Sequence, residues 1–565
     1  MEIIKLNRIS NLAWVTLLLR LRVIIIWKIS YYPRLIEFWT VKLVISSKFP
    51  LEAVFLFDVY SWVFGGRVLL ITSRIFIFSQ DYIKEESFYN RFHLLVLAFV
   101  LSIIALIFSL NIISIILGWD GLGLSSYLLV IYYQRPKSFN AGILTALSNR
   151  IGDVFIIASC ALATLLESTN FYIENLRNLR IWSPLILLVL IASITKRAQI
   201  PYSAWLPAAI AAPTPVSALV HSSTLVTAGV YLIFRFRWAL EKPVLETILW
   251  LGTLTIVIAG ISALREIDSK KVVALSTLRQ LGLIFSGLGL SAQKIAFFHL
   301  IIHAFIKAML FVTIGNTIHS SFSSQDLRVS GQRELTITIS RAFMLVANSG
   351  LMGIPFLAGF YSKDLWLEFS INKDFNISLM LLFYVRVSLT VIYSLRLILI
   401  IFLKNSKELS MGNYKDWDSY NMASMGILWA MTLTFGSLAI RVLITVPFLR
   451  EIRINVKNFT LDVIFLSILV AMSINYISSK SKTSLFLKNL WGLTFFRAST
   501  SRLLVNPLSK YLNIYLETKS KVIESTVTRF FKAFRGFRLD ELRLTLILKH
   551  TFGLALVIAF LIILV

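Results

Sequence analysis

The sequence predicts an all-α, polytopic membrane protein with about 15–16 transmembrane helices. Two observations carry this prediction. Of the 565 residues, 57% are hydrophobic and only 15% are charged, whereas soluble domains have about 25% charged residues. Apolar runs long enough to cross a bilayer recur along most of the chain, and they do not alternate as the strands of a membrane barrel would. Helices are therefore the expected element throughout.

The apolar runs give the candidate membrane spans in chain order. The first, 8–29, contains Arg20 and Arg22 and lacks a small-residue cleavage site, so we expect a membrane helix rather than a removable signal. The other candidate spans are 53–75, 91–110, 111–133, 141–166, 183–204, 214–235, 244–264, 271–290, 293–316, 335–360, 376–403, 423–447, 460–478 and 546–565.

A proline-rich segment at 199–215 interrupts this pattern. Each proline removes a backbone donor, so helices are expected to break there. Broken backbone at membrane depth is tolerated only inside protein or beside a water-filled cavity. An ordinary loop at the membrane interface is the alternative. The four prolines are Pro201, Pro207, Pro213 and Pro215.

The C-terminal region mixes apolar and basic residues. It is typical of an amphipathic helix that lies along a membrane or along other helices, and the alternative is a long solvated loop. The expected organisation is N-terminal transmembrane helices at 1–100, a core at 101–385, additional helices at 386–480, this amphipathic lateral segment at 481–545 and a terminal helix at 546–565.

Charge and cysteine content exclude several functions. The chain has 56 Lys and Arg against 29 Asp and Glu, a net charge of +27. These charges are scattered among apolar runs, which argues against nucleic acid as a partner and fits positive loops on the inner side of a membrane. The single Cys160 excludes an internal disulfide and a four-thiolate iron–sulfur cluster. Without a Walker A or G-x-G-x-x-G motif, we expect no cofactor in this chain.

Ionisable residues inside apolar spans are costly, so each is a functional candidate. Asp120 lies in a long apolar stretch and can change its protonation state there, although a helix-end cap is the alternative. Lys196 ends an apolar run just before the proline-rich break. A lysine at a helix end usually extends to the interface, but the break favours a buried cavity.

The most specific pattern is a set of three ionisable residues within one apolar run. His299, His303 and Lys307 are spaced i, i+4, i+8, so they share one face of a helix. A zinc site is not expected, because no carboxylate or cysteine ligand accompanies the pair of histidines. Neutral imidazoles and a desolvated lysine can exchange protons, so a proton relay is the better interpretation. His221, after the proline break, either joins the relay or bonds a free carbonyl.

Two further pairs of charges stand near apolar runs. Arg150 and Asp153 are one helical turn apart and are expected to form a structural ion pair. Lys363 and Asp364 follow an apolar run and mark one end of a possible proton path.

Three motifs resemble one known family. They are Trp119-Asp-Gly-Leu-Gly-Leu-Ser-Ser-Tyr, the segment from Trp205 to Ile233, and Phe356-Leu-Ala-Gly-Phe-Tyr-Ser-Lys-Asp. They resemble the antiporter-like membrane subunits of mitochondrial NADH–ubiquinone oxidoreductase, respiratory complex I. Chain length and the form of the first motif favour the chain 5 family over its sister subunits. The resemblance is strongest over residues 110–365.

The resemblance implies a fold and residue roles. The fold would contain two inverted five-helix repeats with broken helices, plus a C-terminal lateral helix. Asp120 would pair with Lys196 where protons enter, and many family members have glutamate at the first position. The polar axis of His221, His299 and His303 would lead to the central Lys307. Lys363 and Asp364 would lie on the exit side.

The resemblance also implies a cellular role. The chain would translocate protons in the multi-pass membrane arm of the respiratory complex in the mitochondrial inner membrane, in contact with lipid and neighbouring antiporter-like subunits. NADH, FMN, iron–sulfur clusters and ubiquinone would be bound by partner subunits, where electron transport would occur. A stand-alone cation/proton antiporter of bacterial type shares these motifs and is one alternative. A structural membrane scaffold without transport is another.

Two residues depart from the family pattern. Arg197 follows Lys196, and Arg279 interrupts Leu275-Ser-Thr-Leu-Arg-Gln-Leu-Gly. The family usually has serine at both positions, and a second cation beside Lys196 would disturb the proposed carrier. Some mitochondrial codes read AGA and AGG as serine. A translation under the wrong code is therefore one hypothesis for both residues, which peptide mass spectrometry tests.

Overall fold

The computed structural model describes ten stretches of the chain and one single residue, all within one compact unit, 1–493. The predicted span 8–29, the lateral segment 481–545 and the terminal helix 546–565 lie outside the described residues. The described residues are 37–44, 51–84, 86, 88–165, 179–237, 240–320, 325–328, 338–371, 377–403, 419–443 and 454–477, where 86 stands alone and 325–328 is a short turn.

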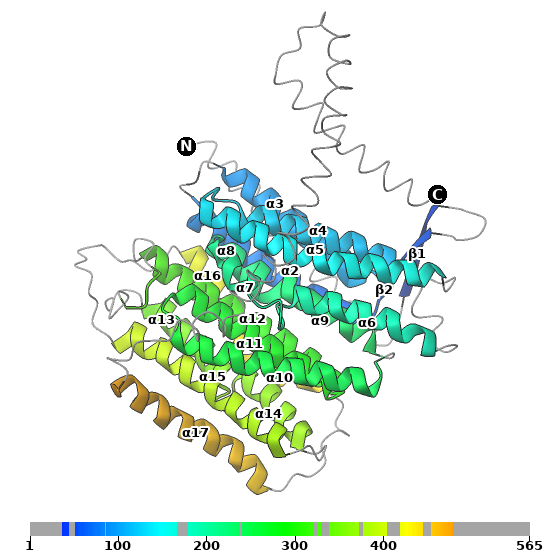
Figure 1. Ribbon diagram of the computed structural model, residues 1–565. Coiled ribbons are helices and arrows are strands. Elements are labelled where there is room, and N and C mark those ends of the chain that lie inside the picture. Colours follow the sequence, from blue (N-terminus) through cyan, green and yellow to red (C-terminus); the bar gives the residue numbers. More distant parts are fainter. Residues whose placement is uncertain are drawn as a thin grey trace, which may run out of the picture. The chain divides into compact units, whose positions relative to one another are not determined.

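The described part is almost entirely helical, which confirms the predicted fold class. Long helices run side by side (Figure 1). With the short α7 and α8 included, the helices in chain order are α2 Val59–Tyr82, α3 Tyr89–Phe108, α4 Ile112–Val130, α5 Pro136–Leu165, α6 Leu179–Lys196, α7 Trp205–Ala208, α8 Thr214–Val216, α9 Leu225–Arg235, α10 Lys242–Arg265, α11 Ser269–Gly289, α12 Gln293–Ser320, α13 Thr338–Met352, α14 Ala358–Ile371, α15 Ile377–Leu403, α16 Ser419–Leu443 and α17 Ile454–Ile477.

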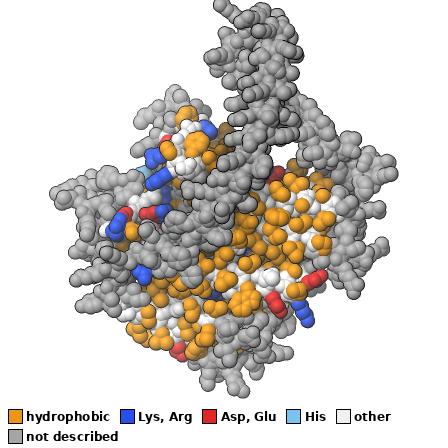
Figure 2. Space-filling model, viewed as in Figure 1, with side chains coloured by type: hydrophobic (Ala, Val, Ile, Leu, Met, Phe, Trp, Pro, Cys, Tyr) orange, Lys and Arg blue, Asp and Glu red, His pale blue; other side chains and the backbone are white. Residues whose placement is uncertain are grey.

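Nine of the described helical segments are long and apolar enough to cross a membrane. The visible face of the molecule carries mainly hydrophobic side chains, and its few charged side chains lie toward the margins (Figure 2). Almost all residues of the segments through α11 and α12 are buried, whereas fewer than half of those in the α5 segment are. The helices α11 and α12 therefore lie at the centre of the described fold.

The predicted span 53–75 starts too early. Residues 51–57 form strand β2, Leu51–Phe57, which pairs antiparallel with β1, Glu37–Val44. Helix α2 begins after Asp58, whose carboxylate accepts a hydrogen bond from the Ser61 amide at 2.8 Å while the Ser61 hydroxyl accepts one from the Asp58 amide. This reciprocal capping sets the start of the helix. The apolar pattern alone does not separate a short buried strand from a helical turn.

The predicted break at 199–215 is confirmed, and it begins earlier than expected. Helix α6 ends at Lys196, so the predicted span 183–204 extends too far. Beyond it the chain forms α7, the 3₁₀ turn η1 at Ala209–Ala211, α8 and the π-helix η2 at Ser217–Thr224. Pro207 lies in α7 and Pro213 directly precedes α8. The fixed backbone angle of proline suits a first helical turn but stops a continuing helix.

A second break was missed by the sequence patterns. The predicted span 335–360 is two helices, because α13 ends at Met352 and α14 begins only at Ala358. Gly353 has φ of +88°, a conformation that glycine adopts readily, and Pro355 cannot supply a backbone donor. The described fold therefore has one interruption directly after Lys196 and a second shortly before Lys363.

Candidate functional site

Lys196 is held inside the protein at the end of α6. Its side chain is fully buried, so it does not extend to the membrane interface. The ammonium Nζ donates a hydrogen bond to the Trp119 carbonyl oxygen at 2.7 Å and lies 3.8 Å from the centre of the Trp119 ring. A cation over an aromatic face is attracted by the electron density of the ring. Trp119 of α4 therefore fixes the position of the Lys196 charge.

The same tryptophan holds a carboxylate of α5. The Trp119 indole Nε1 donates to Asp153 Oδ1 at 2.9 Å, and Arg150 Nη1 lies 3.3 Å from Asp153 Oδ2. The Arg150–Asp153 pair thus has the geometry expected from its spacing. Gly152 makes this arrangement possible, because a Cβ there would approach Thr195 Oγ1 to 2.3 Å and push α5 from α6.

Asp120 was expected to form an ion pair with Lys196, and the structure does not show this pair. The described residues contain no ion pair between them. Asp120 is partly exposed, while its neighbour Trp119 points into the protein. Asp153 forms no ion pair with Lys196 either, but Trp119 links the two, because its indole donates to Asp153 and its carbonyl accepts from Lys196. Successive residues of a helix point about 100° apart, so the helix that directs Trp119 inward turns Asp120 aside.

His221 lies in the π-helix η2, just after the proline-rich break. It is buried beside the edge of the Trp205 ring, and neither ring nitrogen makes a hydrogen bond to another described residue. The Trp205 indole donates to the Thr195 carbonyl at 3.0 Å, which ties the break back to the end of α6. π-Helical turns are rare and often occur at functional sites.

Helix α12 carries the central residues on one face, as their spacing predicts. The His299 ring bridges two neighbouring helices: Nδ1 is 2.7 Å from Ser362 Oγ and Nε2 is 3.3 Å from Gln280 Oε1. The His303 ring centre is 6.3 Å from that of His299. One turn further, Lys307 donates to the Ser276 hydroxyl of α11. All three α12 residues are buried.

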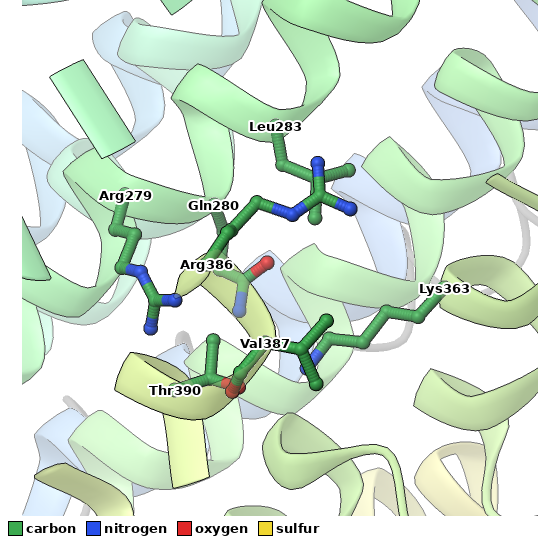
Figure 3. Close-up of a pocket in the computed structure, with 7 residues that line it drawn as sticks. All are labelled: Arg279, Gln280, Leu283, Lys363, Arg386, Val387 and Thr390. Atoms are coloured by element: carbon green, nitrogen blue, oxygen red, sulfur yellow. The ribbon is translucent and has the colours of Figure 1, made fainter. Parts of the chain in front are cut away.

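Lys363 stands at the second break. Its ammonium donates to the carbonyl oxygen of Leu351, in the last turn of α13, whose carbonyls lack partners within that helix. Lys363 directly follows Ser362, the contact of His299, whereas Asp364 is only half-buried. Lys363 also lines a small cavity (Figure 3), together with Arg279, Gln280, Leu283, Arg386, Val387 and Thr390.

By the buried polar axis we mean six buried residues, Lys196, His221, His303, Lys307, His299 and Lys363. Lys196 lies beside the first break and Lys363 beside the second, and the His299 and His303 rings are neighbours on α12, whereas both ring nitrogens of His221 and of His303 lack a hydrogen-bond partner among the described residues. Each member can gain or lose a proton, and neutral histidine can do both through its two nitrogens. No group of three His, Cys, Asp or Glu side chains in the described stretches is placed to hold a metal ion. The arrangement suits proton exchange between neighbouring side chains.

Sequence reasoning missed four polar contacts of this axis. Three of them share one signal, a small or amide side chain in an otherwise apolar helix that faces an ionisable group. The fourth is the tryptophan, and all four stand in quoted motifs in which they had been given no role. They are Ser276, Gln280, Ser362 and Trp119.

The broken helices and the buried polar axis define an antiporter-like membrane protein. A family model described as NADH:quinone oxidoreductase/Mrp antiporter matches residues 109–392, and one described as NADH dehydrogenase subunit 5 C-terminus matches 393–519. The chain belongs to the NADH-ubiquinone oxidoreductase chain 5 family. It is thus an antiporter-like membrane subunit of the proton-translocating respiratory complex I, and it assembles with other subunits.

Curated relatives from insects support this assignment. NADH-ubiquinone oxidoreductase chain 5 of Aedes aegypti is 47% identical over 73% of this chain and 72% of its own length. The protein of the same name from Anopheles quadrimaculatus is 44% identical over 79% and 77%. Among solved structures, the Mrp complex from Dietzia sp. DQ12-45-1b contains a chain with a TM-score of 0.71 at 20% identity. The match covers 93% of this chain and 61% of that one, and shows the shared fold.

Proposed function

We propose that protons cross this subunit along the buried polar axis between Lys196 and Lys363, with Lys307 at its centre. The observation that carries the proposal is the His299 bridge. This imidazole contacts Gln280 on one side and Ser362, next to Lys363, on the other. It therefore connects the helix that bears Lys307 to the helix that bears Lys363. A histidine with one donor and one acceptor nitrogen can pass a proton between such neighbours.

The field at Lys196 would be set by the α5 pair. Asp153 is shared between the Trp119 indole and Arg150, while Trp119 also accepts the Lys196 hydrogen bond. If Arg150 moved away from Asp153, more negative charge would face Lys196 and would favour a proton there. If Arg150 moved closer, less negative charge would face Lys196 and the proton would be released more easily. Since charges interact strongly where water is scarce, small shifts in this pair change the energy of a proton on Lys196.

The energy for transport would come from elsewhere in the complex. Each charge that crosses the membrane requires about 2.3 kcal/mol per 100 mV. NADH oxidation and ubiquinone reduction, with FMN and iron–sulfur clusters, would take place in partner subunits. Neighbouring antiporter-like subunits and lipid would cover the apolar exterior in the mitochondrial inner membrane, and no nucleic acid would bind.

The test uses the assembled complex in proteoliposomes. Lys307→Ala should lower the number of protons moved per NADH oxidised, because it removes the central carrier of the axis. Lys271→Ala is the matched control: Lys271 lies on α11 but is about 40% exposed and pairs with Asp268 at 2.7 Å. Unchanged pumping in Lys307→Ala, with full assembly shown by native electrophoresis, would contradict the proposal.

A further inference from the structure

Several buried and half-buried arginines of the described residues fall into two groups. In the first, the guanidinium has suitable partners. Arg235 binds Asp58 through two nitrogens, at 2.6 and 2.9 Å. Arg396 donates to the Glu266 carbonyl at 3.1 Å and to the Leu264 carbonyl, both at the end of α10, where helix carbonyls lack partners. A guanidinium has five donors and no acceptor, so such partners are what its burial requires.

Arg197 belongs to the second group. Its side chain is fully buried, and only Nη2 has a hydrogen bond, to the Leu281 carbonyl at 2.7 Å. Nε and Nη1 have no acceptor, and the group lies over the Phe285 ring at 4.3 Å. The side chain is also crowded, because a Cβ on Gly229 would come within 2.9 Å of Arg197 Cγ.

Arg279 and Arg386 repeat this situation at the cavity beside Lys363. Arg279 is buried with its guanidinium 5.3 Å from the centre of the Tyr393 ring, and none of its three nitrogens has a hydrogen-bond acceptor. Arg386 lies 3.7 Å over the Trp366 ring, and its Nη1 has no acceptor. Figure 3 shows both guanidinium groups near the Lys363 side chain. No carboxylate lines this cavity, so three cations would share it without a counter-charge.

Serine would fit all three positions. Buried serines on the same helices donate to a carbonyl of their own helix and need no other partner, as Ser276 does to Val273 and Ser394 to Thr390, both at 2.6 Å. A shorter side chain at 279 and 386 would also leave room for water beside Lys363, where protons must leave or arrive. Arg67 is not included, because both terminal nitrogens bond to carbonyl oxygens.

We infer that positions 197, 279 and 386 carry serine in the protein that the source organism makes. The physical reason is the same at each position: a buried guanidinium has at least one donor nitrogen without an acceptor and forms no ion pair among the described residues. The difference would arise in translation, because the standard code reads AGA and AGG as arginine and some mitochondrial codes read them as serine. The structure thereby extends to position 386 a hypothesis that the sequence raised for 197 and 279.

Two measurements test the inference, and neither depends on whether the chain moves protons. Sequencing the gene should show AGA or AGG at all three positions and CGN codons at the paired Arg235 and Arg396. Mass spectrometry of the subunit from the purified complex should give the serine mass, with no tryptic cleavage after 197, 279 or 386 but normal cleavage after Arg235 and Arg396. Arginine in the peptide, or a CGN codon, overturns the inference for that position.

Discussion

The two ends of the buried polar axis have opposite charge environments. Around Lys196, Asp153 and Asp120 supply negative charge, and Trp119 positions both the lysine and Asp153. Around Lys363 the cavity holds Arg279 and Arg386 and no carboxylate. Each lysine nevertheless stands next to a broken helix and bonds a backbone carbonyl. Broken backbone therefore places the two lysines, whereas neighbouring helices decide the charge that each one meets.

Serine at positions 279 and 386 would change the charge environment of Lys363. The excess positive charge at the second end would then come from Lys363 alone. An axis with one carrier lysine near each break is a simpler route for protons than one with permanent cations beside the carriers. The predictions below are ordered by their expected effect on proton pumping.

The largest effect is expected from Lys196→Met. Methionine fills similar volume but carries no proton, so pumping per NADH should fall at least about tenfold, more than 1.4 kcal/mol of added barrier. Proteoliposomes containing the assembled complex and a pH-sensitive dye give the measurement. Lys242→Met, at the first turn of α10 and outside the axis, is the control. Equal pumping in both variants would remove Lys196 from the route.

A smaller loss is expected from Asp153→Asn. The amide oxygen can still accept from Trp119, but the negative charge facing Lys196 is gone. Pumping should fall several-fold, about 1 kcal/mol. Asp120→Asn should have the weaker effect, since Asp120 is partly exposed and forms no ion pair with Lys196 among the described residues. The opposite order of the two variants would restore Asp120 as the main partner.

A modest effect is expected from Ser362→Ala. It removes the 2.7 Å contact of His299 Nδ1 and leaves that nitrogen without its hydroxyl, at a cost of about 1 kcal/mol. The pumping rate should fall roughly fivefold while assembly is retained. Ser370→Ala on the same helix breaks only a bond to the Leu367 carbonyl, so it should pump normally. Similar rates in the two variants would argue against the His299 bridge.

Asp58→Asn is expected to have the smallest effect on pumping, because it changes the stability of the folded protein. Burial raises the pKa of Asp58, but the Arg235 charge and hydrogen bonds from Arg235 and Ser61 outweigh it and lower the pKa below its ordinary value. Because the pKa of Asp58 is lower in the folded state, its ionised carboxylate stabilises the fold at pH values above the unfolded-state pKa of ~3.9. This stabilisation is lost as the pH falls through the folded-state pKa.

Asp58→Asn should therefore lower the unfolding temperature at neutral pH, by about 2 kcal/mol of stability. It should also flatten the acid-dependent loss of stability below the unfolded pKa. Thermal unfolding in detergent at a series of pH values measures both effects. An unchanged acid profile would show that the Asp58–Arg235 pair does not control stability in this range.

Much of the molecule follows from the sequence alone. Apolar runs of bilayer length predict the helices, because lipid leaves backbone groups no partner outside a helix. The spacing of His299, His303 and Lys307 places them on one face, since side chains four residues apart overlap on a helix. The prolines at 201–215 predict the first break because their missing donors are a property of the residue itself.

Only the tertiary structure decides which groups meet. It places Trp119, which also contacts Asp153, against Lys196 where an ion pair with Asp120 was expected, because the direction of each side chain depends on how α4, α5 and α6 pack. It reveals the break at 353–357, where one glycine and one proline fall inside an apolar run that resembles a single helix. It also separates paired from unpaired arginines. A sequence gives the number of charges, but only packing gives each charge its partner.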